Sequence, residues 1–283
     1  MNSRALREIA SPRLHGVRND SGGWELFLWV ALTISLALLV LPQANFVWLS
    51  FHADIGLGEV SDELTLGNYA RLLTDPFYLH AFWLTVYLSA LSAGFALLLG
   101  FPTAYALARI GGWVAPAVLS LVLTTSLITI VVKLMGLNII LGPLGMLNNQ
   151  AGVFIGLVQY TLPLIVVLLF GVVQTIPLAL EEAAAILGAT RRATFWFVLL
   201  PNARPGLVSS GLIAFNMCMG AFTSPVLLGG GRVRTVPVLI QQMIIQDTNY
   251  ARGAALSTVL VAFVFLLNLL VVATIARTPQ HAH

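Results

Sequence analysis

Charge is scarce in this chain of 283 residues: Asp, Glu, Lys and Arg make up 9% of it, whereas 58% is hydrophobic and the mean hydropathy is +0.92. A soluble domain normally carries charge on about a quarter of its residues. The composition therefore excludes an ordinary soluble domain. The net charge of +3 is small and scattered, so it also gives no support to a nucleic-acid partner.

Cysteine and the common catalytic motifs are lacking as well. Cys218 is the single cysteine, which excludes an intrachain disulfide and predicts a small core residue. The chain has no G-x-x-x-x-G-K-[ST] loop to hold ATP phosphates, no G-x-S-x-G and no H-E-x-x-H, and its histidines are not at metal-ligand spacing. We therefore expect no catalytic residue, no metal site and no cofactor bound by this chain, which is predicted not to be an enzyme.

Long apolar runs, in contrast, are abundant. About 20 apolar residues of helix cross a bilayer, and none of the runs shows the alternation of a membrane β-strand. The first run is too long for a signal peptide, so we interpret it as a retained anchor. The prediction is an all-α polytopic membrane protein with one membrane domain, 24–277, between tails 1–23 and 278–283. Its six helices are expected at roughly 24–49, 79–108, 113–137, 151–176, 206–228 and 253–276.

The arginines predict the orientation. With a cytoplasmic N-terminus, nine arginines fall in cytoplasmic segments and four outside, with Lys133 within a span. This asymmetry follows the positive-inside rule and predicts that both termini are cytoplasmic. Segment 177–205, between the fourth and fifth spans, is then cytoplasmic too.

Shorter patterns predict features around the spans. "LTLGNYARLLTDP" is typical of a short amphipathic helix that stops before Pro76. "VPVLIQQMIIQ" has helical spacing and is interpreted as a helix on the membrane surface. Gly152 and Gly156 form a small-xxx-small pair, which predicts a close approach of another helix.

The polar segment 177–205 is patterned like two short helices. Pro177 suits a first helical turn, and Glu181 and Glu182 suit the positive end of the helix dipole. The first helix is expected to end at Gly188. The second is expected to be capped by Thr190 and terminated by Pro201, with Pro205 starting the return into the membrane. Two interpretations are open: a helix that docks into another protein, and an ordinary capped loop helix.

The spacing within this segment resembles a known motif. Glu182-Ala183-Ala184, three residues, Gly188, nine residues and Val198-x-Leu200-Pro201 resembles the EAA motif, E-A-A-x3-G-x9-I-x-L-P, of type I ATP-binding-cassette (ABC) importer permeases; valine replaces its isoleucine. Between residues 64 and 276, "LTLGNYARLLTDPFY", "GFPTAYALAR", "GPLGMLNN", "FTSPVLLGGG" and "GAALST" are similar to stretches of the spermidine/putrescine-type permeases.

The resemblance implies a MetI-like bundle with a core at about 79–276 and cytoplasmic coupling helices. It implies partners: a second permease subunit, two ATPase subunits that hold ATP and Mg, and an extracytoplasmic binding protein. It implies a bacterial inner membrane. The ATPase-coupling residues would be Glu182, Ala183, Ala184, Gly188, Val198, Leu200 and Pro201.

The cargo implied by the resemblance is a polyamine or a similar small organic solute. The alternatives within this importer class are an amino acid derivative, an opine, a phosphonate or iron. An ion-coupled secondary transporter is a rival, but it should carry intramembrane carboxylates or an inverted repeat, and neither is visible. A membrane scaffold that recruits a cytosolic partner is a second rival.

Ionisable and polar residues within the spans are candidates for the translocation path. Lys133 can line a cavity, pair with a partner subunit or extend to the membrane surface. A polyamine needs carboxylates or aromatic faces, yet no Asp or Glu lies centrally in a span. Either the partner permease supplies the charge, or specificity lies in the binding protein, or the cargo is different. The neutral candidates are Tyr87, Gln159, Tyr160, Asn216 and Thr223.

Overall fold

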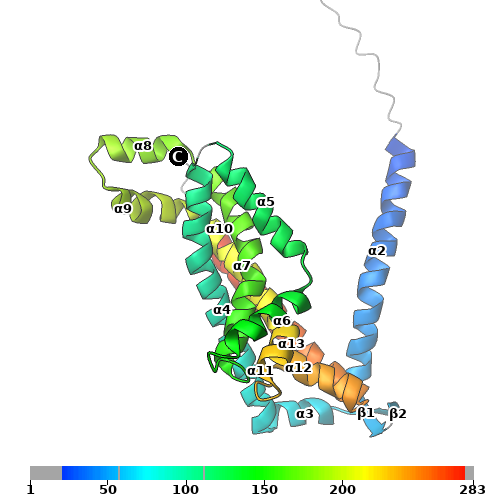
Figure 1. Ribbon diagram of the computed structural model, residues 1–283. Coiled ribbons are helices and arrows are strands. Elements are labelled where there is room, and N and C mark those ends of the chain that lie inside the picture. The colour runs from blue at the N-terminus through cyan, green and yellow to red at the C-terminus, as the bar shows by residue number, and fades with distance from the viewer. Residues whose placement is uncertain (1–20, 57, 111, 278–283) are drawn as a thin grey trace, which may run out of the picture. The chain divides into compact units, whose positions relative to one another are not determined.

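The structure is a computed structural model that describes residues 21–56, 58–110 and 112–277 (Figure 1). Its internal contacts separate two units, a first that ends at Phe46 and a second that begins at Val47. The helical elements are α2 (Ser21–Ser50), α3 (Gly67–Thr74), α4 (Pro76–Arg109), α5 (Val114–Leu127), α6 (Ile130–Leu141), α7 (Gln150–Gln174), α8 (Leu178–Ile186), α9 (Arg191–Thr194), the π-helix η1 (Phe195–Leu199), α10 (Leu200–Met219), α11 (Thr223–Gly229), α12 (Val236–Gln241), the π-helix η2 (Gln242–Gln246) and α13 (Tyr250–Arg277). The strands are β1 (His52–Gly56) and β2 (Glu59–Leu64).

The predicted all-α polytopic architecture is confirmed. Within the described residues, four helices are long and apolar enough to span a membrane, and two bent helix pairs bring the number to six if each pair counts as one span. The four single spans are Phe27–Ser50, Pro76–Arg109, Gln150–Gln174 and Tyr250–Thr274. The predicted tails 1–23 and 278–283 lie outside the described residues, apart from the start of α2 at Ser21.

The third and fifth predicted spans are not continuous helices. The chain bends by 98° between α5 and α6, because Ile128 and Thr129 have extended ψ angles of 129° and 133° that interrupt the helical ladder. It bends by 59° between α10 and α11, around Gly220. Hydropathy does not distinguish a straight span from a broken one, since both are equally apolar.

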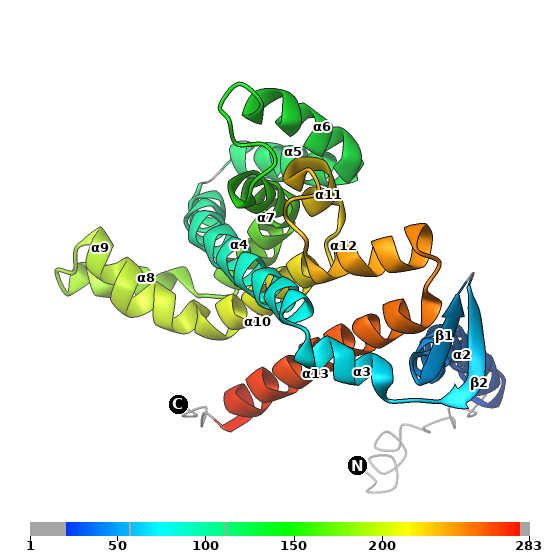
Figure 2. The same cartoon turned by 90° about the horizontal axis from the view of Figure 1, so that it is seen from below.

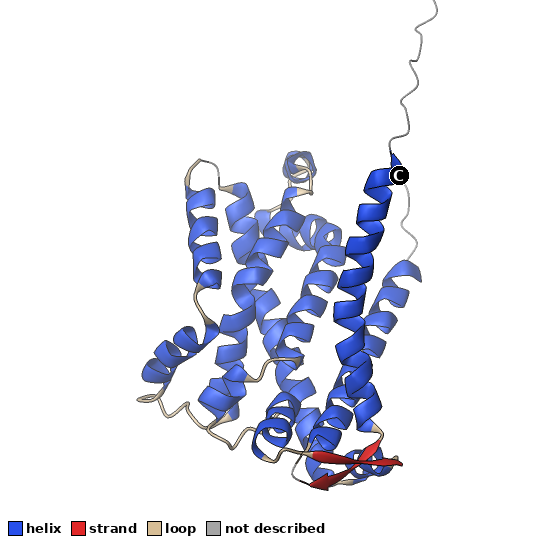
Figure 3. Cartoon of the chain, turned by 90° about the vertical axis from the view of Figure 1, so that its right-hand side faces the viewer, coloured by secondary structure: helices blue, strands red, loops and turns tan. Residues whose placement is uncertain are grey.

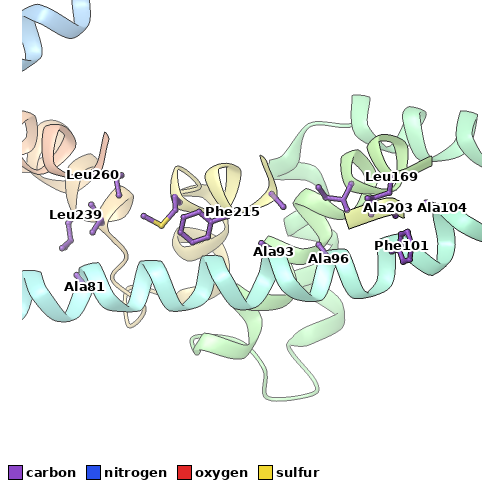
Figure 4. Packing of buried hydrophobic residues seen from close by; sticks show 14 of the residues in the cluster. Ala81, Ala93, Ala96, Phe101, Ala104, Leu169, Ala203, Phe215, Leu239 and Leu260 are labelled. Atoms are coloured by element: carbon purple, nitrogen blue, oxygen red, sulfur yellow. The ribbon is translucent and has the colours of Figure 1, made fainter. Parts of the chain in front are cut away.

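The centre of the second unit is formed by α4, α7 and α10. Small side chains line the shared faces: Ala96, Ala104 and Ala203 are completely buried, and Figure 4 shows them beside Leu169 and Phe101. A methyl group on Gly100 would lie 3.0 Å from the Ile165 side chain. Such residues let helix backbones approach closely, which is the main packing device within a membrane.

The small-xxx-small pair of α7 packs as predicted. A Cβ atom on Gly156 would collide with the Ser224 hydroxyl and lie 2.6 Å from Leu228, and one on Gly152 would collide with the Met146 carbonyl. Ser224 also donates a hydrogen bond of 3.1 Å to the carbonyl oxygen of Val153. The missing side chain of Gly156 therefore admits α11 against α7, whereas that of Gly152 mainly admits the backbone of the loop before α7.

A β-hairpin and the short helix α3 come directly before α4 in the chain (Figure 3). β1 and β2 are antiparallel, with His52 opposite Leu64 and Gly56 opposite Glu59. The sequence did not predict this hairpin. The helix predicted before Pro76 is confirmed as α3, and the buried Asn68 amide ties it to the carbonyl oxygens of Ser50 and His52 at 3.0 and 2.9 Å.

The prediction that "VPVLIQQMIIQ" lies on the membrane surface is wrong. This stretch forms α12 and η2, whose Val236, Leu239 and Met243 are buried and which pack against α13 and α4 (Figure 2). The amide of Val236 donates to the Thr85 hydroxyl of α4 at 2.8 Å. An apolar helical face is compatible with lipid and with protein alike, and only the contacts with α4 and α13 distinguish the two.

Candidate functional site

The first half of the motif lies on α8, which projects near the C-terminal end of α4 (Figure 1). Pro177 lies at the N-cap of this helix, one residue before the first turn in which we expected it. No residue of α8 is buried. Glu182 and Ala183 are exposed, Ala184 is half-buried, and Ile186 and Leu187 are 86% and 87% exposed. The motif thus presents a carboxylate and small or apolar side chains at an open surface.

Gly188 ends α8 as predicted. The amide of Ala189 donates to the Ala184 carbonyl and the amide of Gly188 to the Ala185 carbonyl, both at 3.0 Å. This pair of bonds is the Schellman motif, which places a residue in the left-handed region. Gly188 has φ +82°. The Thr190 hydroxyl then accepts a hydrogen bond of 3.3 Å from the Ala193 amide and caps α9, also as predicted.

Pro201 does not terminate the second helix, which corrects the sequence prediction. α9, η1 and α10 follow one another without a break from Arg191 to Met219. Pro201 falls in the first turn of α10, directly after the π-helical turn in which the Leu200 amide bonds to the Phe195 carbonyl. Proline removes one bond from a helical ladder, and here it follows directly on a π-helical turn, where the ladder already changes its spacing.

The second half of the motif therefore lies at the base of the projection. Val198, Leu200 and Pro201 are half-buried, and Leu199 between them is 1% exposed in the main core cluster. Phe195 packs on the rings of Phe101 and Tyr105 of α4, with centroids 5.4 and 5.9 Å apart. This half of the motif lies against the bundle, while the half on α8 is largely exposed.

An ion pair that the sequence did not predict links α8 to α4. Glu181 accepts from Arg109 Nε at 2.8 Å and lies 2.6 Å from Arg109 Nη2, and its second oxygen accepts from the Tyr105 hydroxyl at 2.9 Å. Arg109 Nη2 also donates to the Ile176 carbonyl at 3.2 Å. The only available signal was the rarity of charge: Arg109 and Glu181 are oppositely charged residues at predicted helix ends on the same side of the membrane.

A cavity of about 620 Å³ lies between this ion pair and α9. Tyr105, Arg109 and Glu181 form one wall, and Arg191 and Arg192 contribute two further cationic side chains, both exposed. Its surroundings are more basic than acidic.

The candidate translocation residues lie on several elements of the second unit. Tyr87 of α4 is 56% exposed, and Lys133 is half-buried in the first turns of α6, directly after the break in the third span. Thr223 begins α11. Gln159 and Tyr160 are half-buried on α7, and the Gln159 Oε1 atom is buried without a hydrogen-bond partner among the described residues.

Asn216 has a partner within the chain. Its amide donates to Asn268 Oδ1 of α13 at 3.0 Å, and Asn268 donates back at 3.3 Å and to the Val264 carbonyl at 2.6 Å. This reciprocal pair holds α10 to α13. The observation favours helix packing for Asn216 over the predicted contact with cargo.

Polar residues that the sequence prediction missed line two cavities near α12. One, of about 230 Å³, is lined by Gln241, Gln242, Gln246 and Arg234, among others. The other, of about 420 Å³, is lined by residues that include His80, Arg232 and Arg234, whose guanidinium lies 5.7 Å from the Phe77 ring. Among the residues that the structure describes, no Asp or Glu lines either cavity.

Comparison with known sequences identifies related proteins. The family described as "Binding-protein-dependent transport system inner membrane component" matches residues 66–278. The spermidine/putrescine transport system permease protein PotB of Haemophilus influenzae is 27% identical over 86% of this chain and 88% of that protein. The molybdenum transport system permease protein ModB of Mycobacterium bovis is 31% identical over 75% of this chain and 84% of that protein.

Comparison with solved structures gives the same architecture. A chain of a bacterial ABC transporter involved in the import of the acidic polysaccharide alginate matches with a TM-score of 0.71 and 18% identity. The match covers 98% of this chain and all of the other. At this identity the likeness concerns the fold.

Proposed function

Because the chain belongs to the family of binding-protein-dependent transport system inner membrane components, the permeases of ABC importers, we propose that it moves a polyamine or a similarly small organic solute. It is a multi-pass protein of the inner membrane. In our proposal both termini and α8 are cytoplasmic, and the partners are a second permease subunit, two ATPase subunits that bind ATP and Mg, and an extracytoplasmic binding protein.

The observation that carries the coupling role is the form of α8. Glu182 and Ala183 are exposed on a helix with no buried residue, and the hydrogen-bonded turn at Gly188 defines where that helix ends. A small-residue face can enter a groove of another protein closely, and a carboxylate at its edge can select the register. The stretch from Val198 to Pro201 lies at the base of the segment, where Leu199 and Leu200 pack in the main core cluster.

The mechanism follows from this geometry. Closure of the two ATPase subunits on ATP displaces α8, and the displacement reaches the bundle through the helices that pack at its base. The bundle then exchanges an outward-open for an inward-open arrangement. ATP and cargo can drive this exchange only if they bind the two arrangements with different affinity.

The proposed cargo has support from one relative and a constraint from the cavities. The H. influenzae relative is a spermidine/putrescine permease. The described residues that line the cavities near α12 include Arg232 and Arg234 and no carboxylate, so these cavities offer a polycation little electrostatic attraction. We therefore propose that cargo is selected by the binding protein. The relative from M. bovis is a molybdenum permease, which makes molybdate the most informative competitor.

The coupling role is tested by reversing one charge. In a complex purified with its ATPase subunits, we expect Glu182→Arg to abolish ATP-dependent uptake and to lower ATPase co-purification, with unchanged expression of the permease. Glu63→Arg is the matched control, because Glu63 is an exposed carboxylate on β2. Normal uptake by Glu182→Arg would refute the coupling role. Uptake without ATP would instead favour a secondary transporter.

Calorimetry on the cognate binding protein tests the cargo. We expect spermidine or putrescine to bind, and molybdate, amino acid derivatives, opines, phosphonates and iron not to bind. Tight binding of any of the latter in place of a polyamine would overturn the cargo assignment and leave the permease role intact.

A further inference from the structure

α8 has an unusual means of attachment. None of its residues is buried, so no apolar side chain fixes its orientation on the bundle. Its main backbone packing is against α9 and η1, which belong to the same projecting segment. Its orientation relative to the bundle must therefore depend on the connections at its ends and on polar contacts.

The polar contacts concentrate on one side chain in the first turns of α8. Both carboxylate oxygens of Glu181 are engaged, one by Arg109 and the other by Tyr105. The Glu181 and Arg109 side chains are only 12% and 20% exposed, so water screens the pair weakly. It is also the one ion pair between side chains within the described ranges.

We call the contacts of Glu181 with Arg109 and Tyr105 the clamp. Arg109 also holds the connection that precedes α8. Besides Glu181, it bonds to the carbonyl of Ile176, which is buried and stands directly before Pro177. A guanidinium has several donors in a fixed plane and can hold two acceptors at once. One side chain at the end of α4 therefore holds both the entry to α8 and its first turns.

The helix at the other end of the clamp packs against much of the bundle. α4 packs against α7, α10, α12, α5 and α3, and its buried residues run from Ala81 to Leu107. A force applied at Arg109 thus reaches every helix that surrounds α4. Without the clamp, a displacement of α8 would reach α4 indirectly, through η1 and α10 at the base and through α7, which all pack on α4.

We propose that Glu181 is a positioning residue that, with Arg109 and Tyr105, transmits the movement of α8 directly to α4. The neighbouring carboxylate, Glu182, is exposed and meets the ATPase, whereas Glu181 faces inward and holds the helix to the bundle. The two adjacent glutamates therefore have separate roles. This inference rests on the proposed coupling function of α8.

The experiment measures coupling in the complete complex with its binding protein in proteoliposomes. Three quantities are compared with the native complex: ATPase co-purification, ATP hydrolysis, and cargo taken up per ATP hydrolysed. We expect Glu181→Gln to retain the ATPase subunits within about twofold and to lower uptake per ATP by about tenfold, since it removes a charge-assisted interaction. Tyr105→Phe, which removes one bond to Glu181, should lower it by about two- to threefold.

Controls separate this role from folding and docking. Glu59→Gln, an exposed site on β2, should match the native complex in ATPase co-purification and hydrolysis. Arg109→Lys keeps the positive charge but has poorer geometry for holding two acceptors. It should therefore retain part of the coupling that Arg109→Gln loses. Unchanged uptake per ATP in Glu181→Gln would overturn the inference. Loss of the ATPase subunits in Glu181→Gln would also overturn it, because Glu181 would then act in docking.

The native complex shows whether the proposed function itself fails or only the positioning role of Glu181. If it shows no ATP-dependent uptake of any cargo that its binding protein accepts, the proposed function fails. If it transports and Glu181→Gln transports with the same yield per ATP, only the positioning role fails.

Discussion

Gly188 allows a test of the coupling segment that involves backbone conformation alone. Its φ angle is +82°, and a Cβ atom added there would meet nothing within 4 Å. An alanine at this position therefore creates no collision and removes no contact. Its only direct effect is the strain of placing an L-residue in the left-handed region, at the turn that separates the exposed half of the motif from α9.

The size of that strain is known from general conformational energies. An L-residue in this region costs about 1–2 kcal/mol, with alanine near the lower value, a β-branched residue near the upper one, and asparagine well below both. A difference of about 1.4 kcal/mol is a factor of ten in an equilibrium. We therefore expect Gly188→Ala to weaken binding of the ATPase subunit by up to about fivefold, Gly188→Val by up to about thirtyfold, and Gly188→Asn by less than about threefold.

The assay is equilibrium binding of the ATPase subunit to detergent-solubilised permease, with thermal unfolding of the permease recorded in parallel. Gly171 is the matched control: it is exposed, nothing lies within 4 Å of an added Cβ, and it lies within the regular helix α7. Gly171→Ala should leave binding unchanged, since alanine is favoured in a helix by about 0.5–1 kcal/mol. If Gly188→Val binds as tightly as the native chain, docking does not depend on this turn and the argument fails.

Two further predictions concern the packing of the bundle. Gly156→Ala should lower the free energy of unfolding by about 1–3 kcal/mol, measured by thermal unfolding in detergent, because its methyl group meets Ser224 and Leu228; Gly136→Ala, where nothing lies within 4 Å, should change it little, and equal shifts would contradict this reasoning. Asn216→Leu and Asn268→Leu should each destabilise by about 1 kcal/mol, and the double variant by less than their sum, because the two amides bond to each other. Strict additivity in that double-mutant cycle would show that the pair is not coupled.

Much of the coupling segment was predictable because its signals are local. Gly188 follows an alanine-rich helix at the position where a Schellman turn needs glycine, and Thr190 precedes the next helix at its N-cap. These residues act through bonds to neighbours three to five positions away, so their effect is visible in a short stretch of sequence. Pro201 was misinterpreted because its usual effect, helix termination, is cancelled by the π-helical turn before it.

The translocation path was less predictable because its candidates depend on what faces them. Asn216 and Gln159 are both polar residues within apolar spans and look alike in the sequence. In the structure the first is paired with Asn268, whereas the second has a buried oxygen without a partner among the described residues. This difference cannot be predicted from the sequence, because it depends on how α7, α10 and α13 pack.

The sequence by itself determined that the chain lies in a membrane, that its spans are helical, and that an exposed helix ends at Gly188. These properties follow from hydropathy and from hydrogen bonds between near neighbours. Only the tertiary structure decided that two spans are broken, that α12 is buried, and that Glu181 turns to Arg109 while Glu182 remains exposed. Glu181 and Arg109 are 72 positions apart, and whether such residues meet depends on how the whole bundle packs.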